Sequence, residues 1–200
     1  MIRAIFLDVD GTLISFSTHE IPASARRALT QAHERGVRLF IATGRAANDL
    51  GPLEGIPYDG VVSLNGARCV ANDGRVVSLH PIPRADFERA LALSEEQDFA
   101  MGLELEEGVF VNRVTPDVER VAHMVAHPVP EQTDLRELFG RVECCQLCFY
   151  FDAETQRRVM AELPTLVASR WCPIFADVNV AGIDKATGME EFMRSYGFSA

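Results

Sequence analysis

Two aspartates, Asp8 and Asp10, directly follow an apolar run near the N-terminus, in the segment Ile5–Ile14, which reads IFLDVDGTLI. The run predicts a buried strand, and the Gly-Thr pair after Asp10 predicts a turn. Side chains two residues apart share a face of a strand, but the turn that Gly11 permits can re-aim Asp10 and leave Asp8 at the strand tip. A carboxylate that attacks, a second that moves protons and a metal cation would together suit phosphoryl transfer.

A simpler interpretation of these residues is an Asp-Gly turn after a core strand, with the aspartates accepting hydrogen bonds from loop amides. A bare Asp-Gly pair would favour that interpretation. The whole string DVDGTL after AIFL favours the catalytic one.

Two later apolar runs also end in residues that could contact a phosphate. Phe40–Arg45, FIATGR, predicts a strand ending in Thr43 before a helical stretch, where a hydroxyl and free backbone N–H groups can bind phosphate oxygens. Taken alone, Thr43 is better explained by helix capping. Val61–Ala67, VVSLNGA, predicts a strand ending at Asn65 and a glycine, a pair that by itself indicates only a turn.

A fourth segment, Gly182–Gly188, reads GIDKATG and contains Lys185. This lysine opens a predicted helix that runs to about Tyr196. A cation at a helix N-terminus opposes the helix macrodipole by a few tenths of a kcal/mol up to ~1 kcal/mol, so we expect an anionic partner. A solvated surface lysine is the alternative, and the three preceding segments favour the functional interpretation.

The four segments, in this order, resemble the motifs of the haloacid dehalogenase (HAD) superfamily of phosphohydrolases, and the third looks like its Cof-like subfamily IIB, which includes bacterial sugar-phosphate phosphatases. The resemblance implies an α/β fold with a doubly wound, Rossmann-like parallel core and an inserted α+β cap domain. It also implies a Mg²⁺ cofactor and an aspartyl-phosphate intermediate. The residues implied are Asp8 and Asp10 as catalytic residues and metal ligands, and Thr43, Gly44, Arg45, Asn65 and Lys185 as phosphate- or substrate-binding residues.

The pattern of the first 66 residues supports such a core. Strand 3–8, helix 22–35 and strand 37–42 make a βαβ unit, which predicts parallel strands and a right-handed crossover. Asp8, Asp10, Thr43 and Asn65 then lie at carboxyl ends of strands, where open α/β sheets bind ligands.

The pattern changes after Gly66, and we predict a core of residues 1–80 and 182–200 around a cap of residues 81–181. The resemblance implies that this cap closes over the site and selects the leaving group. Candidate specificity residues in the cap are better explained by structural roles, and none is assigned: Glu104, Asn112, Arg113, Arg170, Trp171, Asp177 and Asn179. The elements predicted from residue 68 onward are a hairpin 68–79, helices 84–98, 117–126, 133–139 and 153–163, strands 100–106 and 109–113, a long strand 142–151, and short strands 167–170 and 174–178.

Composition constrains the partners. The formal net charge of −10 argues against nucleic acid, because binding along a phosphate backbone requires a basic face. No long apolar run predicts a membrane span or membrane partner, and no secretory pattern precedes the first strand, so we expect a cytoplasmic protein. The five cysteines are an odd number, with three in Glu143–Cys148, which predicts core thiols rather than disulfides. The resemblance implies a small phosphorylated metabolite as the partner, which the net charge does not preclude; the oligomeric state is not indicated.

The resemblance also calls for a further acidic motif after the Lys185 helix, whose aspartates complete the Mg²⁺ site. The sequence ends at Ala200 before such a motif. We therefore expect these 200 residues to be a fragment of a longer protein. Within them, Asp8 and the backbone carbonyl of Asp10 are the expected Mg²⁺ ligands, with weakened metal affinity.

Three other functions fit part of the sequence. A phosphomutase would pass the phosphoryl group to another hydroxyl of a sugar and yield an isomeric phosphate instead of free phosphate. A receiver-like signalling module would keep the phosphate on Asp8, but the cap and the second aspartate have no role in it. A chain without its last motif could also be a non-catalytic remnant.

Overall fold

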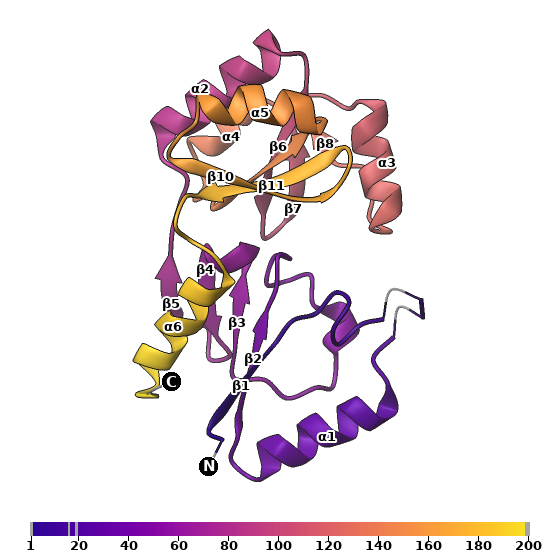
Figure 1. The fold of residues 1–200 in the computed structure, drawn as a ribbon, viewed down its shortest axis with the longest axis vertical. Helices are drawn as coiled ribbons and strands as arrows, with labels where there is room; N and C mark the ends of the chain where they lie inside the picture. Colours follow the sequence, from indigo (N-terminus) through magenta and orange to yellow (C-terminus); the bar gives the residue numbers. More distant parts are fainter. Residues whose placement is uncertain (1, 16, 19, 199–200) are drawn as a thin grey trace. The chain divides into compact units, whose positions relative to one another are not determined.

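The computed structural model describes residues 2–15, 17–18 and 20–198. The chain forms two compact units (Figure 1). Unit 1 comprises Met1–Leu79 and Ile183–Ala200, and unit 2 comprises His80–Gly182. Among the described residues, no helix combines the length and the apolar character needed to cross a membrane.

Unit 1 is built on a five-stranded sheet in the order β1-β2-β3-β4-β5. β1, β2 and β3 are parallel, and β4 and β5 complete the sheet as antiparallel neighbours. The predicted βαβ unit and the hairpin after residue 66 are therefore confirmed. The strands are β1 (Ala4–Leu7), β2 (Arg38–Ala42), β3 (Gly60–Ser63), β4 (Arg68–Ala71) and β5 (Val76–Leu79).

Helices pack on opposite faces of this sheet because alternate side chains of a strand point to opposite sides. Leu39 and Ile41 of β2 pack in one cluster with Leu29 of helix α1 (Ala23–Glu34). Phe40, between them, lies in another cluster with Phe192 of helix α6 (Lys185–Ser195), at a ring-centroid distance of 4.8 Å. The predicted doubly wound core is confirmed. Two short 3-10 helices complete unit 1, η1 (Gly51–Leu53) and η2 (Leu64–Gly66).

Unit 2 contains a six-stranded sheet in the order β10-β11-β9-β6-β7-β8. All neighbours are antiparallel except β7 and β8, which pair in parallel. The predicted α+β character of this segment is thus confirmed. The strands are β6 (Ala100–Leu105), β7 (Gly108–Val111), β8 (Glu131–Gln132), β9 (Gln146–Tyr150), β10 (Leu166–Cys172) and β11 (Phe175–Val180).

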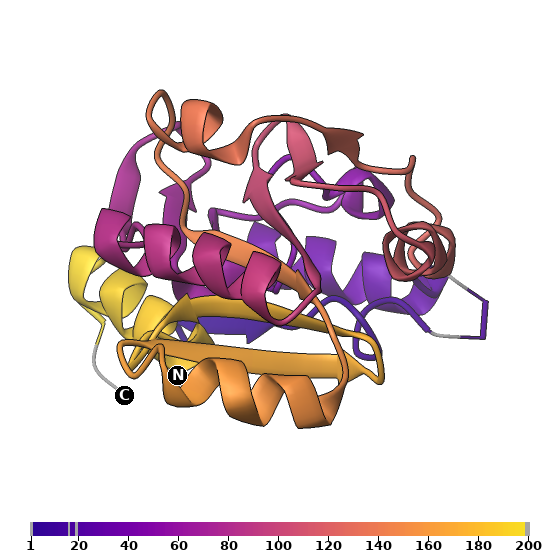
Figure 2. The ribbon, with the colours of Figure 1, turned by 90° about the horizontal axis from the view of Figure 1, so that it is seen from above.

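One face of the unit 2 sheet carries the larger core. Helices α2 (Arg84–Glu96), α4 (Leu135–Phe139) and α5 (Ala153–Ala161) bury apolar side chains there with β6, β9 and β11. Figure 2 shows α2 and α5 lying along the sheet. On the other face, a smaller cluster joins helix α3 (Pro116–Met124) to Cys148, Tyr150 and Phe175. That second face also carries polar residues of β6, β9 and β11.

Two predictions for the strands of unit 2 were wrong in their bounds. The predicted strand 142–151 begins only at Gln146, because the carbonyl of Cys144 accepts the N–H of Ile82 at 2.8 Å instead of joining a strand ladder. The strands predicted as short, 167–170 and 174–178, form a longer hairpin that runs from Leu166–Val180 pairing to Cys172–Phe175 pairing. The period-2 pattern of β10 is hidden in the sequence because two of its exposed positions are apolar, Val167 and Trp171, while the polar Arg170 lies on the opposite face.

Candidate active site

The loop after β1 separates Asp8 from Asp10 as predicted. Gly11 has φ +78°, a backbone conformation that favours glycine. Its N–H donates to the carbonyl of Ile14 at 2.9 Å, and the N–H of Ile14 donates to the carbonyl of Val9 at 2.9 Å. Val9 is buried, which anchors the tight loop in the core. The loop therefore holds two carboxylates beside the end of β1.

The Asp8 carboxylate has a cationic partner from the far end of the sequence. Lys185 Nζ lies 2.6 Å from Asp8 Oδ1, and Thr12 Oγ1 donates to Asp8 Oδ2 at 3.3 Å. The Asp8 side chain still keeps 40% of its surface exposed. Lys185 is the first residue of α6, whose N-cap Asp184 accepts the N–H of Thr187 at 2.8 Å. The anionic partner that the sequence requires for Lys185 is Asp8.

Two glycines allow the start of α6 to approach the end of β3. A Cβ on Gly66 would lie 1.9 Å from the carbonyl oxygen of Asp184, and the φ of Gly66 is +99°. A Cβ on Gly188 would lie 2.5 Å from a methyl group of Val62. No side chain fits either position without movement of the backbone or of a core residue. Small residues at these two positions therefore place Lys185 at the sheet edge that carries Asp8.

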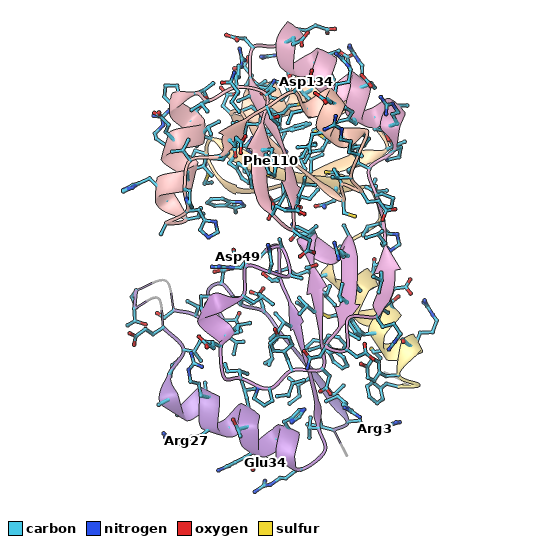
Figure 3. All side chains as sticks on the ribbon, turned by 180° about the vertical axis from the view of Figure 1, so that it is seen from behind. Arg3, Arg27, Glu34, Asp49, Phe110 and Asp134 are labelled. Atoms are coloured by element: carbon cyan, nitrogen blue, oxygen red, sulfur yellow. The ribbon has the colours of Figure 1, made fainter. Side chains whose placement is uncertain are left out.

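Asp10 is held by the guanidinium of Arg45. Arg45 Nε donates to Asp10 Oδ2 at 2.9 Å and Nη2 donates to Asp10 Oδ1 at 2.8 Å, while Nη1 donates to Asp49 Oδ2 at 3.1 Å. The hydrogen bond from Arg45 is the main cause that lowers the pKa of Asp10, and the charges of Arg45 and Lys185 also lower it, against the effect of burial. Figure 3 shows Asp49 at the end of unit 1 opposite Arg3 and Glu34.

The loop after β2 is tied to the turn after β3. The buried Thr43 accepts the N–H of Arg45 on Oγ1 at 3.1 Å, and its carbonyl accepts the N–H of Asn65 at 3.1 Å. A Cβ on Gly44 would lie 3.1 Å from Asn65 Oδ1, so the glycine lets the amide approach. Leu64 and Asn65 both have positive φ, +50° and +55°. Such positions are strained for non-glycine residues and mark a tightly determined turn.

The helical stretch predicted after Thr43 was wrong. The segment from Gly44 to Leu50 is a loop, and the hydroxyl of Thr43 caps the N–H of Arg45 within it. Two adjacent interactions outweigh helix formation here: Arg45 reaches across to Asp10, and the N–H of Leu64 donates to the carbonyl of Arg45 at 3.1 Å. Phosphate contacts at this loop would come from single N–H groups and side chains instead of a helix N-terminus.

The seven residues that the sequence singled out fall into two groups of neighbouring residues. Asp8 pairs with Lys185, Asp10 with Arg45, and the backbone and side-chain contacts above join Thr43, Gly44 and Asn65 to Arg45. Sequence reasoning missed Thr12 and Asp49. Thr12 belongs to the DGT turn, and Asp49 stands four residues after Arg45, a spacing that suggests a contact only in a helix.

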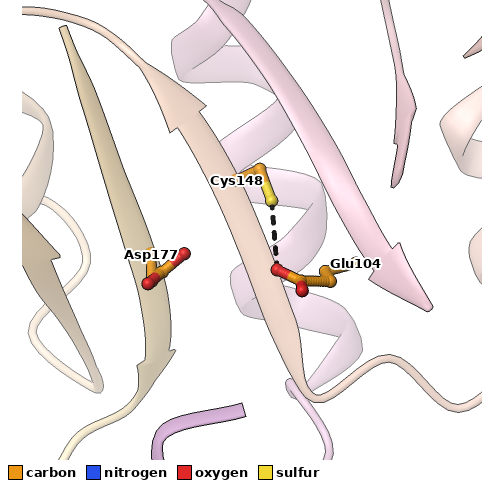
Figure 4. A group of neighbouring side chains, drawn as sticks. All are labelled: Glu104, Cys148 and Asp177. Carbon is orange, nitrogen blue, oxygen red and sulfur yellow. Dashed lines mark hydrogen bonds between the residues drawn. The ribbon is translucent and has the colours of Figure 1, made fainter. Parts of the chain in front are cut away.

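A second polar cluster lies within unit 2, where β6, β9 and β11 meet (Figure 4). One ligand atom each of Glu104, Cys148 and Asp177 lies within 4.8 Å of the others. Gln146 Nε2 donates to Glu104 Oε2 at 2.6 Å and to Asp177 Oδ1 at 3.2 Å. Burial, followed by the nearby Glu104 and Asp177 charges, raises the pKa of the Cys148 thiol, which favours a neutral hydrogen-bonding group.

Several other cap candidates from the sequence have scaffold contacts instead. Asn112 Oδ1 accepts the N–H of Met101 at 3.0 Å. Arg170 Nη1 donates to three carbonyl oxygens, those of residues 151, 172 and 173, at 2.8 to 3.1 Å. Asn179 Nδ2 donates to the carbonyl of Cys145 at 3.0 Å. These side chains organise turns and strand ends. All five cysteines are buried and free, which confirms the prediction of core thiols.

Comparison with known proteins gives one family for nearly the whole chain. The family model of the haloacid dehalogenase-like hydrolases matches residues 5–200. A solved structure of BT1666 from Bacteroides thetaiotaomicron, described among phosphatases of the HAD superfamily, is 54% identical with a TM-score of 0.94. The match covers 100% of this chain and 74% of that protein.

Two further solved structures have the same fold. BT4131, described as a HAD subclass IIB sugar phosphatase, is 30% identical with a TM-score of 0.87, over 98% of this chain and 77% of that protein. TM0651 from Thermotoga maritima is 16% identical with a TM-score of 0.83, over 98% of this chain and 76% of that protein. At that lower identity, the likeness to TM0651 concerns the fold alone.

Proposed function

Because this chain belongs to the haloacid dehalogenase-like hydrolases, we propose that it is a Mg²⁺-dependent phosphatase of small phosphorylated metabolites, with sugar phosphates as the favoured class. The observation that carries the proposal is the 2.6 Å pair of Asp8 and Lys185 at the carboxyl end of β1. Phosphatase chemistry is supported by the 54% identity to BT1666, and the sugar class by the 30% identity to the sugar phosphatase BT4131.

In the first half of the proposed reaction, Asp8 is the nucleophile. One of its carboxylate oxygens bonds to phosphorus, and the bond from phosphorus to the leaving oxygen breaks. Lys185 holds the other carboxylate oxygen and offsets negative charge that develops on the phosphoryl group. Asp10 gives a proton to the leaving alcohol, which departs from the aspartyl-phosphate.

In the second half, water hydrolyses the aspartyl-phosphate and Asp10 accepts a proton from that water. Thr43 and Gly44 contribute polar groups of the loop after β2 to the phosphate, Arg45 follows them with its side chain on Asp10, and Asn65 lies toward the substrate. Their hydrogen bonds to one another in the described structure support a preformed loop, which reduces the ordering cost of binding.

The donor set fits a magnesium ion. The partly exposed carboxylate of Asp8 and the backbone carbonyl of Asp10 are both oxygen donors, the type that Mg²⁺ prefers, and Mg²⁺ usually keeps several waters. When bound, the ion would neutralise phosphoryl charge. Residues His80–Gly182 would act as the cap that selects the substrate, and we place the protein in the cytoplasm.

The test is phosphate release from a panel of sugar phosphates and an aryl phosphate, with and without Mg²⁺. We expect free phosphate from at least one sugar phosphate, and we expect a chelator to abolish it. An isomeric phosphate without free phosphate would instead indicate a phosphomutase. A stable phosphoprotein without turnover would indicate a signalling module, and no reaction at all would contradict catalysis by these residues.

A further inference from the structure

Asp49 holds the side chain of Arg45 in a fixed direction. All three types of side-chain nitrogen of Arg45 are engaged: Nε and Nη2 contact Asp10 at 2.9 and 2.8 Å, and Nη1 contacts Asp49 Oδ2 at 3.1 Å. A guanidinium is planar, so a partner on Nη1 also sets the direction of the edge made by Nε and Nη2. Asp49 therefore acts on Asp10 through Arg45.

The main chain of Arg45 is fixed as well. Its N–H donates to Thr43 Oγ1, and its carbonyl accepts the N–H of Leu64, both at 3.1 Å. Only about a quarter of its side chain is exposed. A long side chain that is held at its backbone and at its tip loses little further freedom when it contacts Asp10. This arrangement is suited to orienting a neighbouring carboxylate accurately.

The two hydrogen bonds from Arg45 match an ionised carboxylate at Asp10. Both of its side-chain oxygens accept an N–H of Arg45. An ionised carboxylate has about four lone-pair sites, so two remain for a proton from water. A protonated Asp10 would carry a hydrogen of its own and would lose part of this paired arrangement. The contact therefore suits the half-reaction that Asp10 enters as a carboxylate.

We propose that Asp49 and Arg45 are positioning residues that orient Asp10 for hydrolysis of the aspartyl-phosphate, an inference that rests on the proposed function. In that step the oxygen of water bonds to phosphorus and the bond between phosphorus and the Asp8 oxygen breaks. The proton of the water passes to Asp10. Inorganic phosphate leaves, and the Asp8 carboxylate is regenerated.

The test uses Asp49→Ala with an aryl phosphate, whose leaving group departs without help from an acid. We expect kcat to fall about 10-fold or more, because acid–base catalysis contributes roughly 10²–10⁴-fold. We expect kcat/KM to stay within about twofold, because it reports only steps up to release of the aryl alcohol. Rapid mixing should show a burst of aryl alcohol, and acid quenching should trap phosphorylated protein.

Three further variants separate positioning from structure. Asp49→Asn keeps an oxygen that can accept from Arg45 Nη1, so it should restore most of kcat. Arg45→Met removes the contact to Asp10 directly and should show the same separation of kcat from kcat/KM, which keeps the test valid if Asp49→Ala fails to fold. Glu191→Ala breaks another arginine pair of unit 1, 2.8 Å from Arg194, and should leave both parameters unchanged.

Other outcomes would overturn the inference. If Asp49→Ala and Arg45→Met lower kcat/KM as much as kcat and trap no phosphoprotein, the pair serves phosphate binding or folding. If Asp49→Ala behaves like Glu191→Ala, Asp49 has no positioning role. A wild-type protein that releases neither aryl alcohol nor phosphate would overturn the proposed function itself, an outcome distinct from the other two.

Discussion

Asp8 and Asp10 stand two residues apart, but they have different partners. Asp8 is paired with a lysine from the start of α6, and Asp10 with an arginine from the loop after β2. The ammonium of Lys185 contacts one oxygen of the Asp8 carboxylate and the Thr12 hydroxyl donates to the other, whereas one guanidinium contacts both oxygens of Asp10. This difference supports the division into a nucleophile and a proton-moving residue.

The pair of Lys185 with Asp8 could be predicted in part from the sequence, whereas the pair of Arg45 with Asp10 could not. A lysine at a helix N-terminus requires an anion, so the partner of Lys185 could be expected at the sheet edge. The pair of Arg45 with Asp10 and Asp49 could not, because it depends on a loop conformation where the pattern after Thr43 suggested a helix. Loop geometry is set by contacts between distant segments, which single-sequence patterns do not contain.

The lowered pKa of Asp10 predicts a pH-dependent contribution of Arg45 to stability. A carboxyl with a lowered pKa in the folded state stabilises the protein above its ordinary pKa of 3.8, and that contribution is lost as the pH falls through the lowered value. Arg45→Met should therefore reduce the free energy of unfolding near pH 7, by less than ~1 kcal/mol because the pair is partly exposed. The reduction should disappear at acidic pH.

Urea denaturation at several pH values measures this difference. The same substitution in an Asp10→Asn, Asp49→Asn background removes both carboxylates that Arg45 contacts, so its effect should not change with pH. A loss that is equal at neutral and acidic pH in the otherwise wild-type protein would show that Arg45 stabilises through packing instead.

At the scale of elements, the site depends on close packing between α6 and the turn after β3. The positions of the strands and helices of unit 1 followed from apolar periodicity, because long regular patterns identify elements well. The close approach of α6 to the turn after β3 did not follow from the sequence, since the roles of Gly66 and Gly188 depend on which segment packs against them. In unit 2, the same periodicity failed for β10, where the apolar Val167 and Trp171 are exposed and interrupt the pattern.

Gly66→Ala should destabilise the protein more than Gly74→Ala. Both glycines have positive φ, +99° and +85°, so both substitutions meet the backbone penalty of ~1–2 kcal/mol. Only at Gly66 would the new methyl group meet another atom, the carbonyl oxygen of Asp184 at 1.9 Å, while nothing lies within 4 Å at Gly74. Chemical denaturation of both variants measures the difference.

The same pair of variants tests the placement of Lys185. Gly66→Ala should lower phosphate release because α6 must shift, and Gly74→Ala should leave it near the wild-type rate. Equal stability losses with equal activities would contradict the packing argument.

At the scale of the whole molecule, each of the two units packs its own apolar clusters among the described residues. The main core of unit 2 is made only of residues between Ile82 and Val180, and its six strands are contiguous in one sheet. Unit 1 is formed from two segments that meet where α6 packs on the sheet. The insertion expected at residues 81–181, because the pattern changes after Gly66, stays a prediction.

Unit 2 produced alone, as residues 80–182, should fold. A contiguous segment with its own core and an uninterrupted sheet meets the requirements of a domain. Circular dichroism should show a single cooperative thermal transition, and one-dimensional NMR should show dispersed methyl signals. A gradual transition with strong binding of a hydrophobic dye would indicate that the core of unit 2 depends on the rest of the chain.

The most direct test of the proposed mechanism is phosphate release by the wild-type protein and by Asp8→Asn, measured side by side with Mg²⁺. Asparagine preserves the size of the side chain but cannot act as the nucleophile. We expect release by the wild-type protein, phosphate transiently bound to Asp8 by mass spectrometry, and no release by a folded Asp8→Asn variant. Metal-dependent hydrolysis retained in Asp8→Asn would contradict the assignment of Asp8 as the nucleophile.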